Sequence, residues 1–177
     1  QITWVGVGSM NLLDQILVTP LQKIAKPGGD VWHAMKSTEE SFQGFGEAYF
    51  SWVKTGAIKA WKQHLQMTMN LVVPVGMVRF VFCDLENNAF REEEIGVNSY
   101  ARITVPPKIW FGFKGLNLQN SLVLNVASIS SYHESHITFW DSERAYLSDT
   151  IAKDNGSTQK SKEKNATEVI MNNGVRH

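Results

Sequence analysis

The sequence predicts an all-β protein, a sandwich or barrel that forms a single domain. Short segments rich in β-branched and aromatic residues recur along the chain, and clusters of Gly, Pro or Asn separate them. No segment shows a sustained helical period, so strands joined by turns account best for the pattern. With 177 residues, of which 43% are hydrophobic, the chain can bury one sizeable core.

The individual elements follow from the positions of these segments. Residues 12–17 are mostly apolar, and Lys26-Pro-Gly-Gly-Asp30 predicts a turn that leads into a strand over residues 30–35. Residues 37–41 begin a loop or a helical turn. The other expected strands are short and β-rich, and they cover residues 47–54, 58–64, 71–84, 100–105 and 121–127. The run Arg91-Glu-Glu-Glu94 is most simply interpreted as a charged loop between strands.

The composition changes near the C-terminus. Between Lys153 and Thr167 there is hardly an apolar residue. Such a segment buries too little apolar surface to offset the entropy of ordering it. We therefore expect a folded domain over residues 1–149 and a polar segment over residues 150–177 that is a solvated linker or a disordered tail.

Charge and composition argue against several classes of protein. Lys plus Arg and Asp plus Glu number 17 each, so the chain lacks the basic excess of a nucleic-acid-binding protein. No apolar run is long enough to cross a membrane, and Asp14 interrupts the apolar residues near the start before a secretion signal could form. Cys83 is the single cysteine and cannot form an internal disulfide. These features predict a cytoplasmic protein.

The spacing of residues 56–76 carries the strongest functional signal. The cupin metal motif runs glycine, five residues, His-x-His, four residues, Glu, six residues, glycine. Gly56, His64 and Gly76 stand in this register, whereas Lys62 replaces the first histidine and Met69 the glutamate. A single imidazole with an ammonium and a thioether is not a credible site for a transition metal.

A second half of the cupin pattern is altered in the same way. The pattern Pro-x-Gly-x-x-His would need glycine at Lys108 and histidine at Phe111. Neither residue is present. The sequence therefore predicts a protein that uses no bound metal and no other cofactor.

The chain resembles the metal-free nucleotide-sugar epimerases of the cupin fold. This family is typified by dTDP-4-dehydrorhamnose 3,5-epimerase and its sugar ketoisomerase relatives. The resemblance extends over roughly residues 15–145, and its matching segments are residues 18–21, 44–51, 58–64, 105–107, 112–113 and 122–125. It implies a jelly-roll fold and a nucleotide-diphosphate sugar as ligand. The implied activity is epimerisation or isomerisation of a 4-keto sugar in deoxysugar or polysaccharide biosynthesis.

Such an enzyme needs a base that removes the proton beside the keto group, a cation or donor that stabilises the enolate, and an acid. The resemblance places Lys62 on the base position and Met69 on that of a lysine that holds the enolate oxygen. Lys62 could act as the base, hold the oxygen as a cation, or only pair with an anion. On a strand, His64 shares a face with Lys62 and could act as acid or base.

Further catalytic residues are implied near the end of the domain. Tyr132 falls close to the family's catalytic tyrosine, although Ser131 could occupy that position instead. Asp141 corresponds to the carboxylate that orients the base.

A silent cupin that binds a sugar nucleotide without converting it is the alternative function, because Met69 and Phe111 replace catalytic side chains.

The remaining candidates would bind the substrate. The aromatic candidates, which suit a sugar or a base, are Trp61, Trp110 and Phe111. The basic candidates, which suit a diphosphate, are Lys59 and Arg79. The other candidates are Glu47, Ser51 and His33. Arg102 is a further charged candidate of this kind, and Phe113 a further aromatic one. Such aromatics are more often core residues, and such charges are often only solvated.

The resemblance also implies a homodimer that exchanges N-terminal strands. The apolar residues that would suit such an interface are Ile2, Trp4, Leu12, Leu13, Ile16 and Leu17. The same residues would suit the core of the chain itself.

Overall fold

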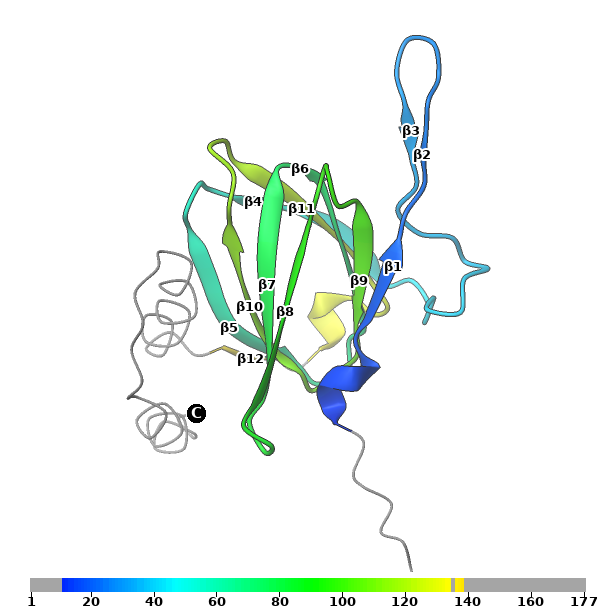
Figure 1. Cartoon of the computed structure of the whole chain (residues 1–177). Coiled ribbons are helices and arrows are strands. Elements are labelled where there is room, and N and C mark those ends of the chain that lie inside the picture. The colour runs from blue at the N-terminus through cyan, green and yellow to red at the C-terminus, as the bar shows by residue number, and fades with distance from the viewer. Residues whose placement is uncertain (1–10, 135, 139–177) are drawn as a thin grey trace, which may run out of the picture.

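Two antiparallel five-stranded sheets face each other in the computed structural model, which describes residues 11–134 and 136–138 (Figure 1). The first sheet has the strand order β1-β9-β6-β11-β4 and the second the order β12-β5-β10-β7-β8. The small pair β2-β3 forms a hairpin that projects from the sandwich (Figure 1). The predicted all-β class is confirmed.

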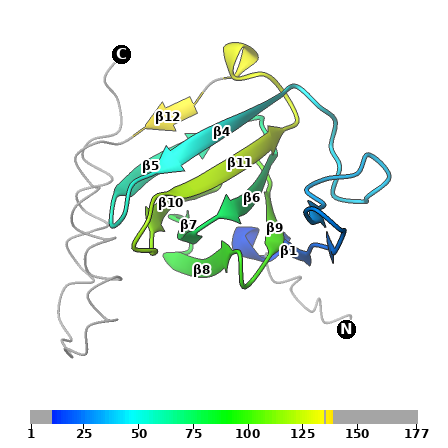
Figure 2. The same ribbon diagram turned by 90° about the horizontal axis from the view of Figure 1, so that it is seen from above.

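The bounds of the elements are as follows. The strands are β1 (Leu17–Pro20), β2 (Lys23–Ile24), β3 (Val31–Trp32), β4 (Glu47–Val53), β5 (Ile58–His64), β6 (Met69–Val75), β7 (Met77–Asp84), β8 (Ala89–Gly96), β9 (Ala101–Val105), β10 (Trp110–Gly115), β11 (Ser121–Ala127) and β12 (His136–Thr138). Two short 3₁₀ helices are η1 (Leu12–Gln15) and η2 (Ser131–His133). Figure 2 shows β12 at the edge of its sheet, beside β5.

The core lies between the sheets because alternate side chains of each strand point inward. Its members include Leu71 and Val73 of β6, Phe80 and Phe82 of β7, and Ile103 of β9. A second, smaller apolar cluster contains Trp61, Val81, Cys83 and Trp110. It lies on the opposite face of the second sheet, since its members alternate along β7 and β10 with residues of the main core.

The expected strand over residues 71–84 is two strands joined by a turn at Gly76. This glycine has a φ of +81°, and an added Cβ would lie 2.3 Å from Oγ of Ser121. Both constraints favour glycine. A residue with a side chain would be strained in this left-handed backbone conformation, and its Cβ would also clash with the neighbouring strand. A continuous apolar run conceals such a break when the turn consists of little more than one residue.

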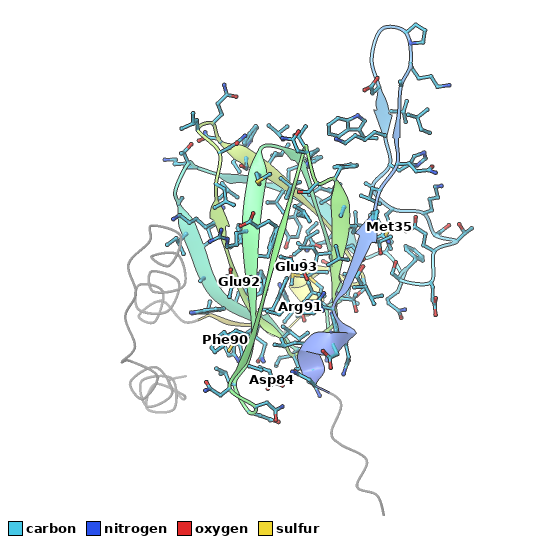
Figure 3. The ribbon with its side chains drawn as sticks, in the orientation of Figure 1. Met35, Asp84, Phe90, Arg91, Glu92 and Glu93 are labelled. Carbon is cyan, nitrogen blue, oxygen red and sulfur yellow. The ribbon has the colours of Figure 1, made fainter. Side chains whose placement is uncertain are left out.

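The charged run over residues 91–94 is part of β8, so its interpretation as a loop is wrong. Its side chains alternate: Arg91 and Glu93 point inward, and Glu92 and Glu94 point outward toward Arg79. Figure 3 shows Arg91 on β8 beside η1. Strand β8 is last in its sheet, and such a position tolerates charged side chains.

Arg91 fixes the N-terminal residues against the sandwich. Its Nη1 donates to the carbonyl oxygens of Leu13 and Ile16, each at 2.9 Å, and its Nε donates to Glu93. Leu13 and Ile16 are buried in the main core of the same chain. Both side chains thus pack in the core of their own chain, and Ile2 and Trp4 lie outside the described residues.

The segment between β3 and β4 covers part of the outer face of the first sheet. Beneath it, Arg102 of β9 is completely buried. Its guanidinium forms an ion pair with Glu39 at 2.5 Å and donates to Oγ of Ser41 and the carbonyl of Ala34. The expectation that Arg102 meets a diphosphate is wrong, because this segment encloses the guanidinium.

Gly46 has no room for a side chain, because the backbone of Ile129 lies against it. A Cβ at this position would lie 2.1 Å from the carbonyl carbon of Ile129. We expect Gly46→Ala to lower the free energy of unfolding by more than about 4 kcal/mol, since a backbone clash must displace a whole segment. Urea unfolding followed by circular dichroism measures this effect.

A matched control is Gly56→Ala. Gly56 has a φ of +69° but open space around its Cβ position, so the replacement should cost only about 1–2 kcal/mol. Equal losses for the two variants would show that the close approach at Gly46 has no special importance.

Candidate active site

A buried histidine and a buried glutamate form the centre of the candidate site. His64 ends β5, and its side chain points between the sheets, where it is 3% exposed. Its Nδ1 lies 2.7 Å from Oε2 of Glu134. A carboxylate in this position fixes the orientation of an imidazole and stabilises the imidazolium that forms when the ring takes up a proton.

Glu134 is itself fixed by the backbone. Its other oxygen, Oε1, accepts hydrogen bonds from the backbone N–H groups of Gln66 and Met67, each at 2.7 Å. Burial by itself raises the pKa of this carboxyl group. The two backbone donors and His64 outweigh that effect, so that the pKa of Glu134 is lowered. The side chain is therefore a carboxylate at neutral pH.

Lys62 shares the inner face of β5 with His64, as the period of a strand predicts. Cross-strand pairing places it opposite Phe111, a member of the main core. Burial lowers the pKa of Lys62, while the nearby carboxylates of Glu134 and Glu47 oppose this shift. The structure thus brings the amine, the imidazole and two carboxylates together.

A bulge in β5 adds Lys59 to the same face. Phe111 pairs with Lys62 but Phe113 pairs with Lys59, so two residues of β10 span the distance of three on β5. Without the bulge, strict alternation along β5 would point the Lys59 side chain to the opposite face of the sheet from Lys62. Its Nζ instead donates to Oγ of Ser51 at 2.9 Å and to the carbonyl of Trp52 at 2.8 Å, and it lies 5.9 Å from the centre of the Phe113 ring.

Strand β4 contributes a tyrosine and a glutamate from the opposite sheet. Tyr49 Oη accepts a hydrogen bond from Nδ2 of Asn125 at 3.1 Å, and Glu47 accepts one from the backbone of Ser131. Burial raises the pKa of Tyr49. Glu47 and Glu134 raise it further, although the Asn125 hydrogen bond opposes them. Tyr49 therefore keeps its proton at neutral pH and can donate it.

Aromatic and apolar side chains cover the inner end of this cluster. The ring of Phe111 is stacked on that of His64 with a centroid distance of 5.9 Å, and Met69 is 3% exposed in the main core. Both residues occupy positions where the cupin motif has metal ligands. Among residues 11–134 and 136–138, no group of three His, Cys, Asp or Glu side chains is placed to hold a metal ion.

Several expected site residues lie elsewhere. Trp61 and Trp110 belong to the second apolar cluster, on the other face of their sheet from Phe111, so the expectation that they line the same space is wrong. Arg79 also points outward, where it pairs with Glu94 at 2.5 Å.

Two more candidates are not brought to the cluster, and one cannot be placed. Tyr132 in η2 is 90% exposed, because the chain turns Glu134 inward instead. His33 follows β3 on the projecting hairpin, where its backbone bonds to Gln22 and its carbonyl oxygen accepts from Tyr100. Asp141 lies outside the described residues.

Two residues of the cluster were missed at the sequence level. Tyr49 could have been found, because it alternates with Glu47 and Ser51 along one expected strand. Glu134 could not, because only the folded chain brings it to His64, 70 positions away.

Comparison with solved structures identifies the fold. The chain is 28% identical to a dTDP sugar isomerase from Desulfovibrio desulfuricans G20, with a TM-score of 0.70 over 75% of this chain and 87% of the other. The chain has the fold of the dTDP-sugar isomerases and epimerases. The resemblance to this group and its cupin jelly roll is confirmed.

Two more distant structures share the fold. A sugar 3,4-ketoisomerase from Thermoanaerobacterium thermosaccharolyticum in complex with TDP is 14% identical, with a TM-score of 0.59 over 80% of this chain and 97% of the other. A dTDP-4-dehydrorhamnose 3,5-epimerase from Bacillus anthracis str. Ames is 16% identical, with a TM-score of 0.60 over 75% and 83%. No protein-family model and no curated protein sequence matches the chain.

Proposed function

We propose that the protein is an enzyme that epimerises or isomerises a nucleotide-activated 4-keto sugar by moving a proton at the carbon next to the keto group. The observation that carries the proposal is the buried pair of His64 and Glu134, with Lys62 on the same strand face. The similarity to a dTDP sugar isomerase supports the class of substrate. The pathway would be that of a deoxysugar or a polysaccharide.

His64 is the base in this proposal. Its Nδ1 is held by Glu134, so proton transfer would run through Nε2. When Nε2 removes the proton, the C–H bond breaks and its electron pair moves to the keto oxygen, which becomes an enolate. Glu134 stabilises the imidazolium, and the ammonium of Lys62 stabilises the enolate oxygen.

Tyr49 is the proton donor. It stands on β4 of the opposite sheet, and its raised pKa keeps it protonated until the enolate forms. A proton returned to the same carbon on its other face completes an epimerisation. Transfer of the neighbouring hydroxyl proton to the enolate oxygen, together with protonation of the former keto carbon, completes a ketoisomerisation.

Lys59 and Ser51 are proposed to bind the nucleotide diphosphate. They lie on the same inner faces as Lys62 and Tyr49, nearer the turn that joins β4 and β5. The ammonium of Lys59 already donates to an oxygen of Trp52, and a phosphate oxygen is a stronger acceptor for it. Two of the related structures hold TDP.

Isotope exchange tests the proposal directly. The protein would be incubated in deuterated water with TDP-4-keto-6-deoxyglucose, a ligand of one related structure. We expect deuterium at C3 or C5 for an epimerase, and at C4 of the converted sugar for an enzyme that moves the keto group from C4 to C3. Absence of exchange with dTDP, GDP and UDP sugars would contradict the proposal.

A catalytically silent cupin is the second candidate. It is favoured by the apolar side chains of Met69 and Phe111, where the resemblance implies catalytic ones. Calorimetry separates the two candidates, since a silent cupin would bind the sugar nucleotide without catalysing exchange.

In the described residues, no helix is long and apolar enough to span a membrane. A cytoplasmic location and a homodimer remain proposals.

The charge of Lys62 predicts an alkaline limit of activity. Burial lowers its pKa, so the ammonium is lost at a pH below 10.5, the ordinary value for lysine. We expect kcat to fall as the pH rises through this lowered pKa. Lys62→Arg should shift the fall to higher pH, because arginine keeps its charge. Lys62→Met should reduce kcat by about 10²-fold or more at neutral pH and should abolish the alkaline fall.

The pH profile of kcat over about pH 6–10.5 measures both effects. If Lys62→Met kept the alkaline fall of the wild type, another group would be responsible for it. Undiminished turnover in this variant would exclude any catalytic role for the lysine.

A further inference from the structure

Asn125 is a buried amide on the inner face of β11, and no step of the proposed reaction uses it. Val123 and Ala127, the inner-face residues on either side of it, belong to the main core, and Asn125 itself is 2% exposed. Burial of an amide among apolar side chains is unfavourable unless new hydrogen bonds replace those with water. The partners of Asn125 therefore indicate what this position requires.

The hydrogen bonds of Asn125 fix which end of its amide faces which partner. Oδ1 accepts from the backbone N–H of Asn70 at 3.1 Å. Because an N–H can only donate, the amide atom that faces it must be the oxygen. Nδ2 is then directed at Oη of Tyr49, at 3.1 Å, and at Sδ of Met67, at 4.0 Å. Asn70 is 1% exposed and is held in turn by a bond to the carbonyl of Val126.

This orientation determines where the phenolic proton of Tyr49 points. The nitrogen of Asn125 can only donate, so Tyr49 Oη accepts from it and must direct its own hydrogen elsewhere. Asn125 is the cross-strand partner of Tyr49 on the interior side, because β11 lies between β4 and β6 whereas β4 ends the sheet (Figure 2). Tyr49 is 38% exposed, so its other side is open. The proton is thus directed away from β11, toward the side that a substrate can reach.

Asn125 also interacts with the phenolate that remains after proton transfer. Burial raises the pKa of Tyr49, the hydrogen bond from Asn125 lowers it, and the charges of Glu47 and Glu134 raise it. A hydrogen bond to a charged oxygen is roughly twice as strong as one to a neutral oxygen. The amide therefore stabilises Tyr49 more after the proton has left than before. An interaction that strengthens in this way accelerates the step.

We propose that Asn125 is a positioning residue for the proton donor: its amide aims the phenolic proton of Tyr49 at the substrate and stabilises the phenolate that is left. The proposal rests on the proposed function. In the step concerned, the O–H bond of Tyr49 breaks and its electron pair stays on the phenolate oxygen. The proton forms a C–H bond with the electron pair of the enolate, and a keto group forms again. Exchange with water then returns His64 and Tyr49 to their neutral forms.

Two replacements of Asn125 separate the donor from the packing. Asn125→Leu has a similar volume but no donor, and it also removes the acceptor of the Asn70 N–H group. Asn125→Asp keeps this acceptor. At alkaline pH its carboxyl group is ionised and can only accept, so the O–H of Tyr49 would turn toward β11, away from the substrate.

Ser128→Ala is the matched control. Oγ of Ser128 accepts from the backbone N–H of Thr68 at 2.9 Å, so this variant loses a bond of the same kind, just before β6. The described hydrogen bonds of Ser128 do not include Tyr49. A loss of order at this end of the sheet would therefore affect Ser128→Ala as well, whereas a loss of the donor to Tyr49 would not.

The partition of the enolate between substrate and product measures the effect. In deuterated water, an enolate that waits longer for the proton of Tyr49 is more often protonated again by His64 on its original face, after His64 has exchanged with the solvent. We expect the ratio of deuterium in recovered TDP-4-keto-6-deoxyglucose to product formed to rise about 10-fold or more in both Asn125 variants. Ser128→Ala should keep the wild-type ratio. A purely structural defect would slow exchange and conversion together and leave the ratio unchanged.

Titration of Tyr49 in the free protein gives a second readout that needs no substrate. The Cζ resonance of ¹³C-labelled tyrosine reports the phenolate, and its absence from Tyr49→Phe assigns it. The pKa of Tyr49 should be higher in both Asn125 variants than in the wild type and unchanged in Ser128→Ala. Glu47, Glu134 and Lys62, the charged groups around the tyrosine, are the same in every variant.

The proposal is overturned if Asn125→Asp, shown to be folded by circular dichroism, keeps the wild-type ratio or the wild-type titration. That result would leave the proposed function intact, because the wild type would still convert the sugar. A wild type that exchanges deuterium into no 4-keto sugar would instead contradict the proposed function, and this proposal with it.

Discussion

Replacement of His64 by Gln is expected to lower the rate of deuterium exchange into the keto sugar by about 10³-fold, within the range of 10² to 10⁴ that general acid–base catalysis supplies. The amide of glutamine can still donate a hydrogen bond to Glu134, so the carboxylate keeps a partner. An amide cannot take up a proton from carbon at neutral pH. The rate of exchange at C3, measured by NMR under saturating substrate, isolates the loss of the base.

His33→Gln is the matched control, since His33 lies on the projecting hairpin and its described contacts are made by its backbone. Its exchange rate should stay within about twofold of the wild type, as expected for a surface change. If His64→Gln kept more than about a tenth of the wild-type rate, proton abstraction would have to be assigned to another group. Lys62 would then be the first candidate.

The strand that carries Lys62 and His64 shows what a sequence can predict about this protein. The period of two places both residues on one face, and the two glycines at the ends of the motif mark the turns before β5 and after β6. These relations are local. For the same reason β4 was predicted almost to the residue, from Glu47 to Val53.

The features that the sequence did not reveal depend on relations between distant segments. The bulge that turns Lys59 inward is a property of how β5 pairs with β10, and residues 58–64 alone do not contain it. The burial of Arg102 likewise depends on a segment that precedes it by about 60 positions. Composition favours exposed positions for charged residues, and only tertiary contacts reverse that preference.

The sequence suggests Tyr132 as the acid, whereas the structure favours Tyr49. This difference also depends on tertiary contacts. Both tyrosines stand near an end of the sandwich, but one belongs to a strand with alternating faces and the other to a single turn of 3₁₀ helix. A strand fixes the direction of a side chain by its pairing. A short turn does not, and a shift of two residues exchanges the exposed Tyr132 for the buried Glu134.

Glu134 should affect both catalysis and stability, and Glu134→Gln tests the two effects together. A neutral amide no longer stabilises the imidazolium of His64, and it can hold the ring in the wrong tautomer. We expect kcat to fall by about 10²–10⁴-fold with little change in KM, since the lost interaction strengthens only when His64 gains its proton. Loss of a buried, charge-assisted hydrogen bond should lower the free energy of unfolding by about 1–3 kcal/mol at neutral pH.

The stability effect has a predictable dependence on pH. The pKa of Glu134 is lower in the folded protein than the ordinary value of 4.5, so between the two values the unfolded chain binds more protons than the folded one. The carboxylate therefore contributes its stability above the unfolded pKa and loses it as the pH falls through the folded pKa. Urea unfolding of the wild type and of Glu134→Gln at several pH values should show a difference that is largest near neutrality and shrinks in acid.

Glu86→Gln serves as the control, because Glu86 is an exposed residue in the turn between β7 and β8. Its stability should stay within about 0.5 kcal/mol of the wild type. A difference between wild type and Glu134→Gln that persisted undiminished in acid would mean that the carboxylate charge is not what holds Gln66, Met67 and His64 together. A lost kcat combined with an unchanged stability would instead restrict Glu134 to the orientation of the base, because the backbone donors would then have found another acceptor.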